Sequence, residues 1–294
     1  IRTMHNRLQS VCFTRFCFDL AASARRQATI IAGMRSTFKI VRFHSCFFRL
    51  DCYNLLIGAL CNSFRCEELI LDFNIVDVSA MQSPRYYSFA ESSTLKVLSL
   101  RLNGERDYAK SYLRSFCSDL NTNESVEKVS IHLTGFLRSP RALPFLSMNR
   151  SIQRLVLEGQ WPANIQVFGD DEVNSTLKYI ECIDVNPHCA FSLQRFTSLE
   201  HLVLRRCDVK TLAPCPWLKR LDLVLTSYID RHLDAILSNF TSLEHLYLSI
   251  KNVPTPHQLE ILRVVLLKNS QLQQIICREG YLNIDHVIKR EEEK

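Results

Sequence analysis

The stretch Leu199-Glu-His-Leu-Val-Leu-Arg-Arg-Cys-Asp-Val209 decides the fold of this chain. Its apolar spacing, LxxLxL, runs from Leu199 through Leu202 to Leu204, and a cysteine follows at Cys207. Residues two apart in a strand point to the same side, so the side chains of Leu202 and Leu204 are predicted to share a core. The residues between and beside them are predicted to point away from that core.

The same LxxLxL phrase returns along the whole chain, and its three apolar places are filled in every copy. Consecutive copies start 19 to 31 residues apart. A period of this length is typical of chains built from stacked units, none of which can bury its apolar side alone. The copies start at Leu8, Phe38, Cys66, Leu95, Val126, Ile152, Leu177, Leu199, Leu218, Leu243 and Leu272.

This phrase and its period resemble leucine-rich repeats. The resemblance covers residues 1–282 as a single array and implies an α/β solenoid of about eleven repeats. A curved parallel sheet would form its concave side and helices its convex side. We expect the N-terminal cap of the array to be missing, and residues 283–294 to form a polar tail or cap, such as a short capping helix.

In leucine-rich repeats, an Asn or Cys after each strand bonds to backbone groups where the chain leaves the sheet. The resemblance assigns that role here to Cys46, Asn74, Asn103 and Cys207. The segments between phrases carry helical patterns of apolar residues. We therefore expect helices near residues 51–64, 108–116, 229–237 and 259–266.

Asparagine stands three residues before several phrases, as at Asn123, Asn149 and Asn174. We expect it to take the left-handed conformation at the end of the preceding segment. These three residues and Asn239 also begin the four Asn-x-Ser/Thr glycosylation sequences. A structural role for the asparagines argues against their glycosylation.

Bulk properties narrow the classes of function. The 36 Lys and Arg exceed the 30 Asp and Glu, and the whole excess comes from residues 1–65, which hold 10 Lys and Arg against 2 Asp. Such asymmetry can attract nucleic acid or an acidic partner, but the basic residues are scattered singly and form no stripe for phosphates. The 12 cysteines include no CxxC pair, so we expect reduced thiols in the cytoplasm or nucleus. No apolar stretch approaches the roughly 18 residues of a membrane span.

The residues that point away from the core on the concave side are the candidate site. They combine Tyr, His, Arg and carboxylates, and protein interfaces favour Tyr and Arg as anchors. We expect them to contact a protein partner, the alternative being an ordinary solvated sheet face. The candidates are Arg154, Glu158, Tyr179, Glu181, His201, Arg205, Arg220, Asp222, His245 and Tyr247.

The sequence lacks the common nucleotide-binding and catalytic motifs, so we expect no enzyme, no cofactor and no metal site. His201 and His245 would stand about 10 Å apart on strands two copies from each other, too far to share an ion. Cys12 and His44 would face the same side on neighbouring copies as a Cys/His pair, but no third group orients the histidine.

The irregular repeats with cysteine in the capping place resemble the substrate-recognition repeats of F-box-type ubiquitin-ligase adaptors. They imply a protein–protein interaction module that reaches a cullin-ligase adaptor through a segment ahead of Ile1. The longer copies also resemble ribonuclease-inhibitor-type repeats, which implies an inhibitor or the sensor domain of an immune receptor. A nucleic-acid binder that uses the basic N-terminal third is a third alternative.

Overall fold

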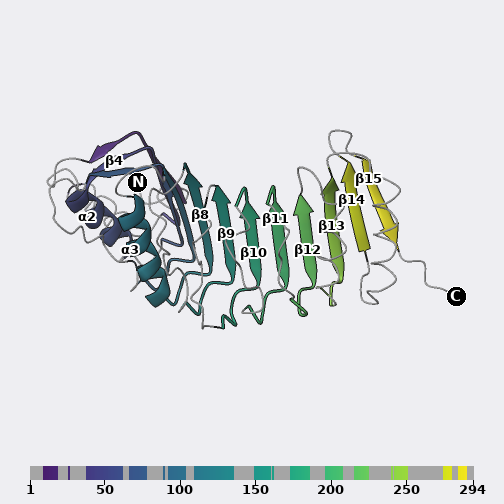
Figure 1. The fold of residues 1–294 in the computed structure, drawn as a ribbon. Helices are drawn as coiled ribbons and strands as arrows, with labels where there is room; N and C mark the ends of the chain where they lie inside the picture. Colours follow the sequence, from purple (N-terminus) through teal and green to yellow (C-terminus); the bar gives the residue numbers. More distant parts are fainter. Residues whose placement is uncertain are drawn as a thin grey trace.

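The computed structural model describes most of the predicted strands. The described residues are 9–18, 26, 38–61, 66–77, 89, 92–103, 109–135, 149–159, 161, 173–185, 196–207, 215–224, 240 and 242–250, together with the backbone of 274–279 and 284–289. They form one row of strands that stand side by side along the molecule, with two helices at the N-terminal end (Figure 1).

The main sheet runs the length of this row. Within the described residues it has 12 strands, which follow one another in chain order. Neighbours from β1 to β14 pair in parallel, whereas β15 pairs antiparallel with β14. The strands are β1 (Ser10–Thr14), β3 (Ile40–His44), β5 (Glu68–Asp72), β7 (Val97–Asn103), β8 (Lys128–Thr134), β9 (Arg154–Gly159), β10 (Tyr179–Ile183), β11 (His201–Arg205), β12 (Arg220–Val224), β13 (His245–Ile250), β14 (Gln274–Glu279) and β15 (Ile284–Lys289).

Parallel neighbours in chain order are the topology of a solenoid, so the predicted parallel-strand solenoid is confirmed. Each LxxLxL phrase contains one of the parallel strands, from β1 in the first to β14 in the last. The number of complete repeats and their family stay predictions. At residues 284–289 the structure has a strand and not the short helix that the polar sequence suggested.

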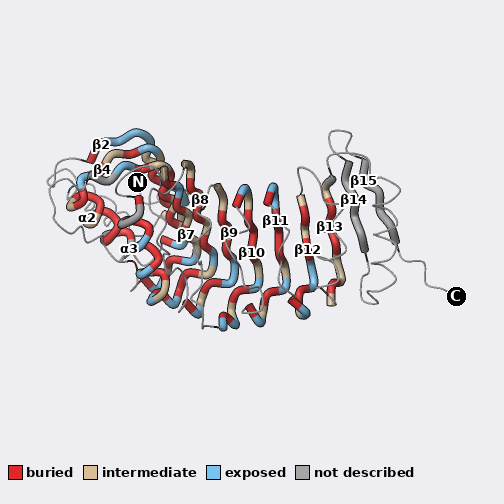
Figure 2. Tube along the Cα trace, viewed as in Figure 1, coloured by how far each residue is buried: buried red, intermediate tan, exposed pale blue. Residues whose placement is uncertain are grey.

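The core is a set of apolar columns that run across the strands. Parallel register places Leu155, Ile180, Leu202, Leu221 and Leu246 side by side, and none of these side chains is more than 1% exposed. Figure 2 shows the buried places repeating from strand to strand. Each fully buried Leu or Ile stabilises the fold by about 1.5–3 kcal/mol relative to an exposed one. From β1 to β13, where side chains are described, the buried residues form one continuous core.

Helices cover the N-terminal end of the sheet. Two of the predicted helices are present, as α2 (Leu50–Cys61) and α3 (Ala109–Thr122), and the hydroxyl groups of Tyr53 and Tyr112 join them by a hydrogen bond. The predicted helices near 229–237 and 259–266 lie outside the described residues. The helix layout along the whole convex side therefore stays a prediction. Neither described helix has the length and apolar character that a bilayer crossing requires.

A second, smaller sheet was not predicted. In the described chain it consists of β2 (Cys17–Phe18), β4 (Phe47–Arg49) and β6 (Ile75–Asp77), which pair in parallel. The rings of Phe18 and Phe48 stack across it with centroids 4.7 Å apart. Because each strand follows directly after a main-sheet strand, the chain must turn sharply between the two sheets.

That turn explains the capping residues. Several main-sheet strands are followed directly by a residue with positive φ. These residues are Arg15, Ser45, Phe73, Asp184 and Arg206. The next residue bonds to the neighbouring copy. Asn74 donates from Nδ2 to the Phe43 carbonyl at 3.1 Å and accepts at Oδ1 from the Cys46 amide at 2.9 Å. The Cys207 thiol donates to the Cys182 carbonyl at 3.3 Å. The predicted capping role is confirmed at Cys46, Asn74 and Cys207.

The asparagines before the strands form a buried ladder. The side chains of Asn123, Asn149 and Asn174 are at most 9% exposed, and none of the three residues has a positive φ. Asn149 accepts at Oδ1 from the amides of Ser151 and Ile152 at 2.8 and 2.7 Å. Its Nδ2 donates to the Asn123 carbonyl at 2.9 Å. The predicted left-handed conformation is wrong, because these residues act through their side-chain amides.

The core assignment predicts the cost of truncation. Leu202→Ala should lower the free energy of unfolding by about 2–5 kcal/mol, because it leaves a cavity inside the apolar column. Arg114→Ala, an exposed change on α3, should shift it by no more than about 0.5 kcal/mol. Urea denaturation followed by circular dichroism measures both, and equal shifts would contradict the facing of β11.

The ladder predicts a second cost. Asn149→Ala should lower the free energy of unfolding by about 1–3 kcal/mol or more. The change leaves buried backbone groups of two copies without hydrogen-bond partners. Gln153→Ala, which removes an exposed amide from the same copy, is the matched control. Thermal unfolding measures the difference. If the two variants melt together, the asparagine ladder does not stabilise the solenoid.

Candidate functional site

We call the outward-pointing side chains of strands β3 to β13 the polar face. All ten predicted site residues lie on it, in three rows set by the parallel register. The first row holds Arg154, Tyr179, His201, Arg220 and His245; the second holds Glu181, Asp222 and Tyr247; the third holds Glu158 and Arg205. That these residues bind a partner stays a prediction.

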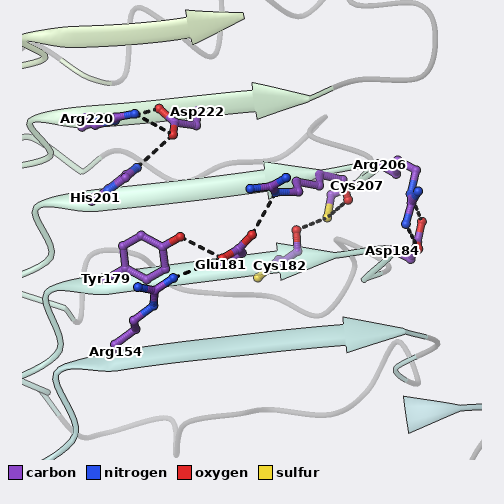
Figure 3. Close-up of polar contacts among 11 residues, drawn as sticks. Arg154, Tyr179, Glu181, Cys182, Asp184, His201, Arg206, Cys207, Arg220 and Asp222 are labelled. Carbon is purple, nitrogen blue, oxygen red and sulfur yellow. Dashed lines mark hydrogen bonds and ion pairs between the residues drawn. The ribbon is translucent and has the colours of Figure 1, made fainter. Parts of the chain in front are cut away.

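Glu181 is the centre of one ion-pair group on this face. It is only 7% exposed, although it points outward. The Tyr179 hydroxyl donates to its Oε2 at 2.8 Å, and Arg205 Nε lies 2.8 Å from its Oε1. Arg154 approaches from the opposite strand, with Nη2 at 3.7 Å from the same carboxylate (Figure 3). Arginines from β9 and β11 and the tyrosine of β10 thus surround one buried carboxylate.

Tyr179 links this group to its neighbours. The Arg154 guanidinium stacks over its ring with Cζ 4.1 Å from the centroid, a cation–π contact. His201 meets the ring edge-on at a centroid distance of 4.7 Å. Burial and then the bond to Glu181 raise the pKa of the Tyr179 hydroxyl to about 12. The hydroxyl is therefore a hydrogen-bond donor across the physiological pH range.

Asp222 is the centre of a second group. Arg220 donates to both of its oxygens, at 3.0 and 3.2 Å, and His201 Nε2 lies 3.1 Å from its Oδ2. Burial alone would raise the pKa of the Asp222 carboxyl, but the bonds from His201 and Arg220 outweigh it and lower the pKa below the ordinary 3.8. The carboxylate is therefore ionised at neutral pH.

A third group, centred on Asp72, was missed by the sequence analysis. This carboxylate is 4% exposed and meets Arg42 at 3.3 Å, with His44 and Arg101 each at 3.8 Å. Its residues lie on β3, β5 and β7, at the same outward places as the predicted ones. The earlier copies carry the same outward alternation as the later ones, so the signal for these residues is present in the sequence.

Charges on the polar face are sorted by depth. The Arg154, Arg205 and Arg220 side chains are 46–50% exposed, whereas those of Glu181 and Asp222 are 10% and 14% exposed. Every other described side chain of the polar face, apart from the basic ones, is half-buried or buried. The exposed members are Arg42, Arg101, Lys128, Arg154, Arg205 and Arg220.

Two other pairs on this side of the sheet, His201 with His245 and Cys12 with His44, do not form a metal or nucleophile site. Arg220 stands between His201 and His245 in the register, and His201 is engaged by Asp222. Cys12 contacts Thr14 at 3.5 Å, while His44 faces Asp72. Within the described part of the chain, no group of three His, Cys, Asp or Glu side chains is arranged to hold a metal ion.

The buried cysteines are also unlike catalytic thiols. Burial raises the pKa of Cys66 to about 12 and that of Cys207 to about 11, so both stay protonated. Among the described residues, the buried Cys46, Cys66, Cys117, Cys207 and Cys215 form no disulfide. Their positions in the core and at the capping place give them packing roles.

Comparison with known proteins adds no family. No family model matches the chain, and no curated protein matches it. The solenoid and its polar face are therefore the features of the molecule that bear on its function.

The Asp222 group predicts a pH effect on stability. A carboxyl with a lowered folded-state pKa stabilises the fold above its ordinary pKa and loses this contribution as the pH falls through the folded value. Asp222→Asn should therefore be less stable than the wild type at about pH 5, and the gap should narrow at about pH 2.5. Urea denaturation at the two pH values measures it.

Glu124→Gln is the control for that experiment, because Glu124 is an exposed carboxylate before β8. Its difference from the wild type should be small at both pH values. A gap for Asp222→Asn that stays constant or widens on acidification would show that its charge does not contribute to stability.

Proposed function

We propose that the chain is a protein-recognition solenoid, and not an enzyme, that binds a partner protein on its polar face. The observation that carries this proposal is the depth sorting of charge, which leaves ordered arginines at the surface. Ion pairs and the stack on Tyr179 hold these side chains before any partner arrives. Pre-ordering reduces the entropy that binding costs. The buried carboxylates are engaged by guanidinium groups, which favours recognition over acid–base catalysis.

Our narrower proposal is a leucine-rich-repeat array of an F-box-like ubiquitin-ligase adaptor in the cytoplasm or nucleus. The LxxLxL strands and the backbone bonds of Cys46, Asn74 and Cys207 support the repeat family. Buried free thiols suit a reducing compartment. The helices α2 and α3 in long copies favour, as a second candidate, an inhibitor or sensor array of the ribonuclease-inhibitor type.

A steric block tests the proposal without altering charge. Ser130 lies on β8 of the polar face, beside Ser99 and Val156 in the register. Ser130→Trp should cover this part of the face and reduce partner capture by about tenfold or more, as judged by affinity purification with quantitative mass spectrometry. Ser118→Trp, at an exposed position on α3, is the matched control.

The outcomes separate the broad proposal from the narrow one. Proteins lost with Ser130→Trp but kept with Ser118→Trp support a partner on the polar face, whereas identical capture by both variants refutes it. With the variants made in the full-length protein, a cullin-ligase adaptor should co-purify with either of them, because its contact is expected outside the polar face. If no such adaptor co-purifies, the ubiquitin-ligase role fails and the recognition role remains.

A further inference from the structure

The exposed charge of the polar face is of one sign. The side chains that reach solvent furthest are all Arg or Lys, along the full run from β3 to β12. The carboxylates of Asp72, Glu181 and Asp222 lie beneath them. A molecule that approaches this face therefore meets hydrogen-bond donors and positive charge first, although positive and negative groups nearly balance in the layer as a whole.

These arginines keep donors for a second acceptor. A guanidinium carries five N–H groups, and Arg205 makes its close contact to Glu181 through Nε. Half of that side chain is exposed, and the contact through Nε leaves its two terminal nitrogens for a second acceptor. Arg154 is held over the Tyr179 ring, with Cζ 4.1 Å from the centroid, and its planar guanidinium also presents N–H groups along its edge. Such edges match the two oxygens of a carboxylate.

Apolar side chains fill the places between the arginines. Val156 and Ile183 are half-buried on β9 and β10, and Val203 is 2% exposed on β11. Protein interfaces combine such apolar surface with Tyr and Arg. Nucleic acids instead depend on uncompensated cations that release counterions, whereas these cations have carboxylates directly beneath them. The composition of the face therefore favours a protein segment.

We propose that the polar face binds a segment of its partner in which Asp or Glu side chains are interspersed with apolar ones. This inference rests on the proposed recognition function and names the chemistry of the partner. Arg154 and Arg220 share the first row of the polar face and lie three strands apart, about 14 Å, which an extended peptide running across the strands spans in about four residues. Acidic residues of the segment should therefore recur at about every fourth position, which also points their side chains to the same side of the extended peptide.

A displayed library of random peptides tests the proposal on the wild-type chain. The enriched peptides should carry an excess of Asp and Glu at spacings of about four residues, together with apolar side chains. Their affinity should fall by about tenfold for Arg205→Gln and for Arg220→Gln, because each change removes a charge-assisted contact. Arg114→Gln and Arg150→Gln, exposed but outside the polar face, should change it less than about twofold.

Two further variants separate contact from charge balance. Arg205→Lys keeps the charge but loses the flat edge, so its affinity should fall between those of the wild type and Arg205→Gln. The double variant Arg205→Gln/Glu181→Gln restores the balance of charge and should still bind weakly. Full recovery in the double variant would overturn the contact with Arg205. A thermal melt of each variant confirms that the solenoid is folded.

The remaining outcomes are decisive as well. The proposal is overturned if no peptide is enriched, if the enriched peptides show no excess of acids, or if a single-stranded oligonucleotide binds more tightly than they do. Peptides without acidic excess that are nevertheless lost on Ser130→Trp would overturn this inference and leave the recognition function standing. If Ser130→Trp changes neither peptide binding nor partner capture, the recognition function falls too.

Discussion

The parallel register between neighbouring strands is the constraint on which this structure depends. It places equivalent residues of successive copies about 4.8 Å apart, so whatever one copy puts at a position meets its counterpart in the next. Apolar places such as Leu202 gain from this stacking and form the core. Charged places would repel unless their sign changes. Just before the strands begin, Lys39 pairs with Glu67 at 3.0 Å, and Lys96 pairs with Glu127 at the same distance.

Periodicity predicted the side to which each strand residue points, because a two-residue alternation leaves little choice. It did not predict depth. Glu181 and Val203 point outward, yet neighbouring side chains leave them 7% and 2% exposed. The predicted backbone conformation of Asn149 was also wrong. It followed from the left-handed preference of asparagine, whereas the Asn149 side chain bonds to a carbonyl of another copy, which its local sequence does not reveal. The second sheet escaped prediction since β2, β4 and β6 have only two or three residues each.

The candidate site shows the same division. All ten residues expected on one face lie there, because copy spacing alone sets the register. The ion pairs among these residues could not be derived from the sequence. Whether Arg205 contacts Glu181 or another neighbour depends on how its long side chain turns. The unequal lengths of the copies make these pairs harder to predict still, because the number of residues between two partners changes along the array. The Asp72 group was within reach of the same reasoning, because its residues occupy the same places in earlier copies.

Recognition and stability are coupled on the polar face. Removing one partner of a buried ion pair leaves a desolvated charge without compensation, which costs more than the intact pair contributes. The exposed arginines cannot therefore be varied freely to suit a new partner while Asp72, Glu181 and Asp222 stay buried beneath them. Changes of specificity should come in matched pairs that span neighbouring strands, or at half-buried places such as Ser130 and Val156 that carry no charge. The constraint that builds the core thus also limits how the surface can change.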